Sequence, residues 1–186
     1  MLTTVKGKIK KFLRINQGNK NRYWNGRKNR IYYQQALTFA KQYAPDAKTV
    51  IDVGPHNTQF LSRVDWVSSK TAIDLKHMPS LPGTNNIQGD FLEFVPKDTF
   101  DLVFCLQVLE HLESPTLFAQ KLLETGKIVV ISVPYQWPPG TRKNHIQDPV
   151  DENKLLSWTK KPWLEKAIIT DDLPRLVAVF EGTNKN

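Results

Sequence analysis

Residues 49–74 read TVIDVGPHNTQFLSRVDWVSSKTAID, and the rest of the chain is interpreted from this segment outward. The first five residues, Thr49 to Val53, form a short apolar run rich in β-branched side chains, which is typical of a buried strand. Gly54-Pro55 then ends the strand. The next residues predict a helix capped by Asn57 or Thr58, since helical spacing relates Phe60, Leu61, Val64 and Val67.

A second short strand, Thr71 to Ile73, leads to Asp74, an acid about 20 residues beyond Asp52. Strand, glycine turn, helix, strand and acid together make one βαβ unit. Such a unit suits a nucleoside ligand, because the turn lets the ligand approach the backbone and the acid accepts hydrogen bonds from both ribose hydroxyls.

The net charge of +8 is concentrated at one end of the 186-residue chain. Residues 1–30 hold ten Lys or Arg residues and no acid, whereas the remainder has slightly more acidic than basic residues. We therefore expect a basic N-terminal arm, residues 1–30, and one domain, residues 31–186. Residues 1–15 predict a basic amphipathic helix, which can lie on an anionic membrane surface, follow a phosphate backbone or remain a solvated arm.

The compartment is inferred from cysteine use and hydropathy. Cys105 is the single cysteine and lies within an apolar run, which excludes a disulfide framework and favours a cytoplasmic setting. No apolar run reaches the roughly 18 residues of a membrane span. The basic arm remains a candidate contact for the inner membrane face.

The remaining segments alternate between strand and helix patterns. A helix is expected from Arg30 to Tyr43, a link at 16–30, strands near 86–91, 100–105 and 127–133, and a helix from Pro115 to Gly126. A long proline-rich loop, residues 134–150, predicts a lid or substrate loop. A helix at 151–160 follows, and two last strands, near 167–170 and 176–180, predict an antiparallel pair at one edge of a parallel sheet.

Four of these segments, in this order, resemble the class I S-adenosylmethionine-dependent methyltransferases. They are Asp52-Val53-Gly54, Asp74, Gly89-Asp90, and Phe100-Asp101-Leu102-Val103 with Leu109-Glu110-His111-Leu112 after it. The resemblance implies a Rossmann-like α/β fold: a mostly parallel seven-stranded sheet with helices on both faces and an antiparallel edge strand pair. It also implies S-adenosylmethionine as cofactor. The turn departs from the family, since Gly54 is followed by His56 and Thr58 where further glycines are usual.

The resemblance also implies roles for individual residues. Asp52 and Gly54 would lie near the methionine part of the cofactor, Asp74 would bind the ribose, and Leu75 would lie against the adenine. Asp90 and Phe91 would contact the adenine, and Gln107 would lie near the reacting methyl group.

Two histidines are the candidate catalytic residues. His145, in the long loop, has the chemistry of a general base, and its alternative is a surface histidine. His111 with Glu110 either takes part in catalysis or anchors the loop by hydrogen bonds. The four histidines show no metal-binding spacing, so no metal site is expected.

The expected function is methyl transfer to an oxygen of a sugar, glycan or small molecule. Residues 145–152, with Leu155, Trp158 and Thr159, resemble small methyltransferases of bacterial cell-surface polysaccharide synthesis. One alternative is a nucleic-acid methyltransferase, favoured by the basic arm and disfavoured by Leu106-Gln107-Val108-Leu109 in place of an Asn/Asp-Pro-Pro-Tyr-type segment. The others are a non-catalytic adenosyl-binding subunit and a nicotinamide-dependent dehydrogenase, which lacks support because Gly-x-Gly-x-x-Gly is absent. The oligomeric state is left open.

Overall fold

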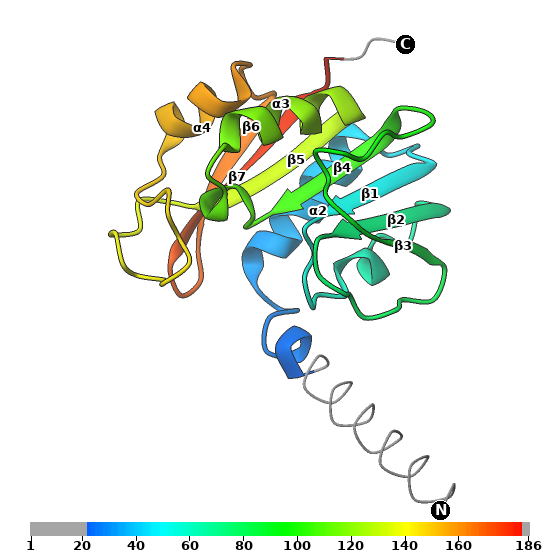
Figure 1. Ribbon diagram of the computed structural model, residues 1–186, viewed down its shortest axis with the longest axis horizontal. Coiled ribbons are helices and arrows are strands. Elements are labelled where there is room, and N and C mark those ends of the chain that lie inside the picture. Colours follow the sequence, from blue (N-terminus) through cyan, green and yellow to red (C-terminus); the bar gives the residue numbers. More distant parts are fainter. Residues whose placement is uncertain (1–21, 184–186) are drawn as a thin grey trace, which may run out of the picture.

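Strand β1 (Thr49–Val53) lies inside the sheet of the computed structural model, which describes residues 22–183 (Figure 1). It pairs in parallel with β2 (Ser69–Asp74) on one side and with β4 (Phe100–Leu106) on the other. Val50, Ile51 and Val53 are almost fully buried. A run of β-branched residues forms this strand because both of its faces are covered.

The sheet has seven strands in the order β3-β2-β1-β4-β5-β7-β6. Strand β3 (Thr84–Gln88) is parallel to β2, and β5 (Gly126–Pro134) is parallel to β4. Strand β7 (Pro174–Glu181) is antiparallel to both β5 and β6 (Glu165–Thr170). This confirms the predicted mostly parallel sheet with an antiparallel pair at one edge. Strands β2 and β3 are added on one side of β1, whereas β4 and the later strands are added on the other, so the strand order reverses between β1 and β4. In open α/β sheets the ligand crevice lies at such a switch point.

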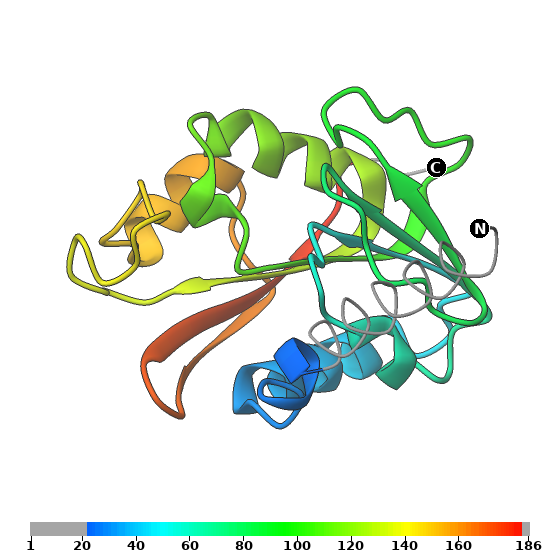
Figure 2. The ribbon, with the colours of Figure 1, turned by 60° about the horizontal axis from the view of Figure 1, so that its bottom comes forward.

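Helices cover both faces of the sheet (Figure 2). Helix α2 (Ile31–Tyr43) packs on one face, and α3 (Pro115–Thr125) and α4 (Glu152–Thr159) pack on the other. Alternate residues of a strand point to opposite faces, so Leu102 and Phe104 join the core under α2, while Val103 and Cys105 join the core under α3. No helix of the described residues is long and apolar enough to cross a membrane.

The prediction of an α-helix after the glycine turn is wrong. Residues Phe60–Arg63 form only a short 3₁₀ helix, η1, and neither Asn57 nor Thr58 is its N-cap. The apolar residues of the predicted helix are buried as expected. Residues 54–59, however, form a turn in which the N–H of His56 donates a hydrogen bond to Asp74. Too few residues then remain before β2 for an α-helix of several turns.

Residues 22–30 pack on the domain, so the expected link is wrong for this part of the chain. Residues 22–25 are helical, and the Trp24 ring is buried against Tyr33, with ring centroids 5.4 Å apart. Arg63 also donates a hydrogen bond to the carbonyl oxygen of Lys28. The expected amphipathic helix at 1–15 lies outside the described residues, and the division into an arm and a domain at residue 30 stays a prediction.

Candidate active site

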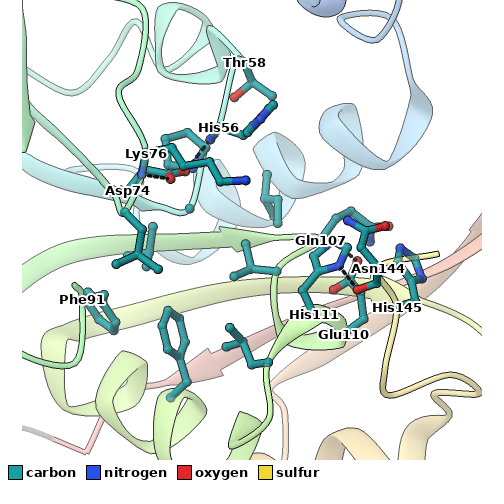
Figure 3. A pocket seen from close by; sticks show the side chains of 18 of the residues that line it. His56, Thr58, Asp74, Lys76, Phe91, Gln107, Glu110, His111, Asn144 and His145 are labelled. Carbon is teal, nitrogen blue, oxygen red and sulfur yellow. Dashed lines mark hydrogen bonds and ion pairs between the residues drawn. The ribbon is translucent and has the colours of Figure 1, made fainter. Parts of the chain in front are cut away.

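A cavity of about 570 Å³ opens at the carboxyl ends of β1, β2 and β4. Its size is that of a small-molecule or cofactor site. The predicted site residues that line it are Gly54, Asp74, Leu75, Asp90, Phe91, Gln107, His111 and His145. Figure 3 shows Asp74 and His56 at one end and Glu110, His111 and His145 at the other, with Gln107 beside this second group.

The turn after β1 is held by its backbone. Gly54 has a φ of 75° and donates a hydrogen bond from its N–H to the carbonyl oxygen of Ile73, at 2.8 Å. A Cβ atom at Gly54 would lie 2.8 Å from Cγ2 of Val108. The turn therefore needs glycine at this position for two reasons: the left-handed backbone and the close approach of the segment after β4.

Gly54→Ala is expected to destabilise the fold by about 2–3 kcal/mol, because a left-handed alanine costs about 1 kcal/mol and Val108 must also move. Gly83→Ala is the matched control, since Gly83 has a φ of 69° and nothing within 4 Å of the added Cβ. Urea unfolding of both variants separates the backbone cost from the steric cost. Equal losses of stability in the two variants would contradict the steric contribution of Val108.

Asp74 joins the turn to the end of β2. Its Oδ2 accepts a hydrogen bond from the N–H of His56 and its Oδ1 accepts one from the N–H of Lys76, both at 2.8 Å. These two bonds fix the plane of the carboxylate. Each carboxylate oxygen has a second lone pair, so Asp74 retains acceptor capacity toward the cavity that it lines.

Asp90 and Phe91 form the wall beyond β3. Oδ1 of Asp90 accepts a hydrogen bond from the N–H of Leu92 at 2.8 Å, and the buried Phe91 ring packs on Phe118 with centroids 5.0 Å apart. Leu75 is 66% exposed and offers an apolar surface on the other side. Together these residues make a slot with apolar walls and a carboxylate at its edge.

Gln107, the residue after β4, has a φ of 61°, which is uncommon for a residue other than glycine. Its N–H donates to the carbonyl oxygen of Ser132, and its side-chain amide donates to the Ser132 hydroxyl at 3.3 Å. These bonds to β5 hold the strained backbone in place. Such strain is concentrated at functional sites in proteins, which is consistent with the position of Gln107 on the wall of the cavity.

Asp52 does not line the cavity, so the expected pocket position is wrong. Alternation along β1 turns its side chain to the face of Val50, under α2, where only 3% of the residue is exposed. Burial, with a further contribution from the Asp74 carboxylate, raises the pKa of Asp52 to about 8.

Two loops meet at the far end of the cavity. The loop after β4 contains the 3₁₀ helix η2 (Leu109–His111), and the loop between β5 and α4 contains His145. The carbonyl oxygen of Glu110 accepts hydrogen bonds from the N–H groups of Ile146 and Gln147, at 3.0 and 3.2 Å. The backbone of Glu110 therefore anchors a loop by hydrogen bonds, in keeping with the non-catalytic alternative for Glu110-His111.

The two candidate catalytic histidines come together here, with ring centroids 4.7 Å apart. Nδ1 of His111 is 2.8 Å from the carbonyl oxygen of Asn144, and Nδ1 of His145 is 2.9 Å from Oδ2 of Asp148 (Figure 3). Burial lowers the pKa of His145, although the Asp148 carboxylate opposes this. The alternative of a surface histidine is wrong, since 7% of the His145 side chain is exposed.

The Glu110 side chain is fully buried beside these rings, and neither of its carboxylate oxygens has a hydrogen-bond partner. Oε1 lies 4.0 Å from Nε2 of His111. Burial raises the pKa of Glu110 to about 8, and the nearby Asp148 carboxylate adds to this effect.

Sequence reasoning assigned no cavity role to several residues that line the site. Trp137 lies between His145, with nearly parallel rings 5.4 Å apart, and the guanidinium of Arg175, 5.2 Å from the Trp137 ring centroid. The Tyr23 and His56 rings meet edge to face, with centroids 5.3 Å apart, and Arg27 lies over the Tyr23 ring. No motif marks these residues, because they lie in three separate segments: residues 22–30 before α2, the long loop after β5, and β7. Only the fold brings them together.

The sheet order, the turn at Gly54 and the acid at the end of β2 are features of the class I S-adenosylmethionine-dependent methyltransferases. The cavity fits this cofactor, since it has the volume, a carboxylate with acceptor capacity for the ribose and an apolar slot for the adenine. A model of the methyltransferase domain family matches residues 23–167. The chain belongs to this family.

Solved structures agree with this assignment. The 1,6-didemethyltoxoflavin-N1-methyltransferase of Burkholderia thailandensis, with its substrate and S-adenosylhomocysteine bound, has a TM-score of 0.72 at 13% identity, over 94% of this chain and 90% of that chain. The N-methyltransferase NodS of Bradyrhizobium japonicum, in complex with S-adenosylhomocysteine, has a TM-score of 0.66 at 14% identity, over 82% and 86%. A putative methyltransferase of Haloferax volcanii, in complex with the activator Trm112, has a TM-score of 0.68 at 12% identity, over 88% and 94%.

At these identities the similarity shows the fold. No curated protein matches the chain significantly. The family model makes the protein a member of the methyltransferase domain family, and the two neighbours in complex with S-adenosylhomocysteine share its fold.

Proposed function

We propose that this enzyme methylates a hydroxyl oxygen of a small polar acceptor, of the sugar or glycan class. The observation that carries the proposal is the pair of imidazoles, His111 and His145, at the end of the cavity away from Asp74. A hydroxyl acceptor must lose a proton during transfer, so a site for it needs electron-pair donors close to the oxygen.

The cofactor end follows from the groups that line it. Asp74 accepts hydrogen bonds from the ribose hydroxyls, Leu75 and Phe91 enclose the adenine, and Asp90 accepts from its amino group. Gly54 lets the methionine part approach the backbone, and Gln107 lines the cavity beside His111, where the methyl end of the cofactor is proposed to lie. The strained backbone of Gln107 and its bonds to Ser132 hold this position before any ligand binds.

When bound, S-adenosylmethionine supplies an electrophilic methyl carbon, whose bond to sulfur breaks toward sulfur as the bond to the acceptor oxygen forms and the hydroxyl proton is released. The residues of the chain contribute position and electrostatics, which are the main requirements of such a transfer. In the tautomer in which Nδ1 of each imidazole donates to its oxygen partner, Nε2 carries the lone pair. Both histidines then present an electron-pair donor to the acceptor.

The acceptor end also carries positive charge. Arg142 and Arg175 line the cavity there, although Asp171 and Asp172 pair with Arg175. Arginine binds phosphate or carboxylate groups, so an acceptor that carries one of them is favoured. A small-molecule acceptor is also in keeping with the related toxoflavin methyltransferase, which has its substrate bound.

The proposal is tested in two stages with the purified full chain. Calorimetric titration with S-adenosylmethionine, S-adenosylhomocysteine and NAD is expected to show micromolar binding of the adenosyl compounds and none of NAD. Isotope-labelled methyl transfer is then measured against sets of nucleotide-linked sugars, free glycans, small amines, RNA and DNA. Labelled methyl ethers of a sugar support the proposal, whereas labelled amines or nucleic acid overturn it.

A further inference from the structure

The carboxylate of Glu110 is buried without a hydrogen bond, and Nε2 of His111, 4.0 Å from Oε1, is too far away to donate one. The residue has no exposed surface, and both Oε1 and Oε2 lack hydrogen bonds. Buried carboxylates in proteins are paired, hydrogen-bonded or bound to metal. The lone pairs of Glu110 therefore lack the group that would normally satisfy them, and the side chain lines the cavity from which such a group could bind.

Two further donors surround this carboxylate. One ligand atom from each of Glu110, His111 and His145 lies within 4.8 Å of the other two, and Nε2 of His111 is 4.0 Å from Oε1 of Glu110. A cation bound at about 2.0–2.2 Å from nitrogen and oxygen donors needs them roughly 3–4 Å apart. Small side-chain rotations therefore bring the three donors to binding distance.

The outer contacts of both imidazoles are those of metal-bound histidines. Nδ1 of His111 is held by the carbonyl oxygen of Asn144 and Nδ1 of His145 by the carboxylate of Asp148. Metal-ligating histidines characteristically donate their other N–H to a carbonyl or carboxylate, which fixes the ring and the tautomer. Here both histidines do so, and Nε2 of each remains as the donor on the side of Glu110.

We propose that Glu110, His111 and His145 bind one divalent transition-metal ion through a carboxylate oxygen and two Nε2 atoms. This set of two imidazoles and one carboxylate selects ions such as Zn²⁺, Co²⁺ or Mn²⁺ over Mg²⁺ and Ca²⁺, which prefer oxygen ligands. The sequence expectation of no metal relied on spacing, and spacing is uninformative here because His145 comes from a separate loop.

The site deepens the proposed function, on which its role rests, and changes the part of the two histidines, because Nε2 lone pairs that bind the ion no longer accept a proton from the acceptor. Three protein ligands leave coordination positions open, and these positions face the cavity. An acceptor hydroxyl bound there loses its proton to water more readily, because the cation lowers its pKa. The metal thus places the acceptor oxygen and activates it, while Asp148 and Asn144 position the two imidazoles.

The test is calorimetric titration of the metal-stripped full chain with CoCl₂, without cofactor, together with the visible absorption of bound Co²⁺. The wild-type protein is expected to bind one equivalent. Glu110→Gln and His145→Gln are expected to lose affinity roughly 100-fold or more, and Asp148→Asn about 10–100-fold. His77→Gln, which changes an exposed histidine outside the cavity, is the matched control and is expected to bind as the wild type does.

Circular dichroism and urea unfolding establish that each variant is folded. Absence of Co²⁺ binding to the wild type overturns the inference, and so does binding that persists in Glu110→Gln and His145→Gln. The fate of the proposed function is read separately, from S-adenosylmethionine binding and labelled product. A protein that binds cofactor and methylates a sugar but binds no Co²⁺ refutes the metal site alone.

Discussion

Asp74→Ala is expected to weaken S-adenosylmethionine binding by roughly 100-fold. Charge-assisted hydrogen bonds contribute about 1.5–3 kcal/mol each, and the carboxylate is proposed to accept from both ribose hydroxyls. The same substitution removes the acceptor of the N–H groups of His56 and Lys76, which loosens the turn after Gly54. Calorimetric titration of wild type and variant with S-adenosylhomocysteine measures the loss.

A second ligand separates direct contact from the loosened turn. The 2′-deoxy analogue of S-adenosylhomocysteine lacks one ribose hydroxyl, so it is expected to bind the wild type about 10-fold or more weakly than the parent compound. In Asp74→Ala the two ligands are expected to bind alike, as in a double-mutant cycle. If the missing hydroxyl weakens binding equally in both proteins, Asp74 does not contact the ribose.

Asp52→Asn is expected to stabilise the protein by about 2–5 kcal/mol at pH 8. Burial raises the pKa of Asp52 to about 8 in the folded state, from 3.8 for the free side chain. Between these values the folded protein holds a proton that the unfolded chain releases, so stability falls as the pH rises from about 4 to 8. Asparagine does not ionise and is free of this loss.

The measurement is urea unfolding of wild type and variant from pH 5 to pH 8, without ligand. The stability difference is expected to grow over this range. Asp101→Asn is the control, since hydrogen bonds from Lys127 and the N–H groups of Lys48 and Thr49, opposed by desolvation, lower the pKa of Asp101 to about 2. Asp101→Asn is expected to destabilise the protein by about 1 kcal/mol, and this loss is expected to be the same at every pH from 5 to 8. If the stability difference between Asp52→Asn and the wild type does not change with pH, the raised pKa of Asp52 is contradicted.

The order of elements could be predicted from the sequence because strand and helix periodicities are local. The run Thr49–Val53, the turn at Gly54 and the acid at Asp74 identify a βαβ unit, and the later strands follow from similar runs. The cofactor end could be predicted for the same reason. Most of its groups lie directly after a strand, and parallel strands bring their carboxyl ends to one edge of the sheet.

The limits of local reasoning appear where competing contacts decide the conformation. Phe60, Leu61 and Val64 have helical spacing, yet the hydrogen bond from His56 to Asp74 uses the residues that a helix would need. Asp52 precedes the turn in sequence, but its side chain points under α2, because its face of the strand is fixed by the burial of Val50.

The α/β fold and the methyltransferase family could be predicted from the sequence alone, because they depend on patterns within single segments; the adenosyl site proposed at the strand ends rests on the same patterns. Only the tertiary structure placed His145 beside Glu110 and His111, and Trp137 beside Arg175. The path of a long loop depends on contacts with distant residues, such as the hydrogen bonds from Ile146 and Gln147 to Glu110. Sequence separation carries no information on such contacts, so the chemistry of the acceptor end emerges only in three dimensions.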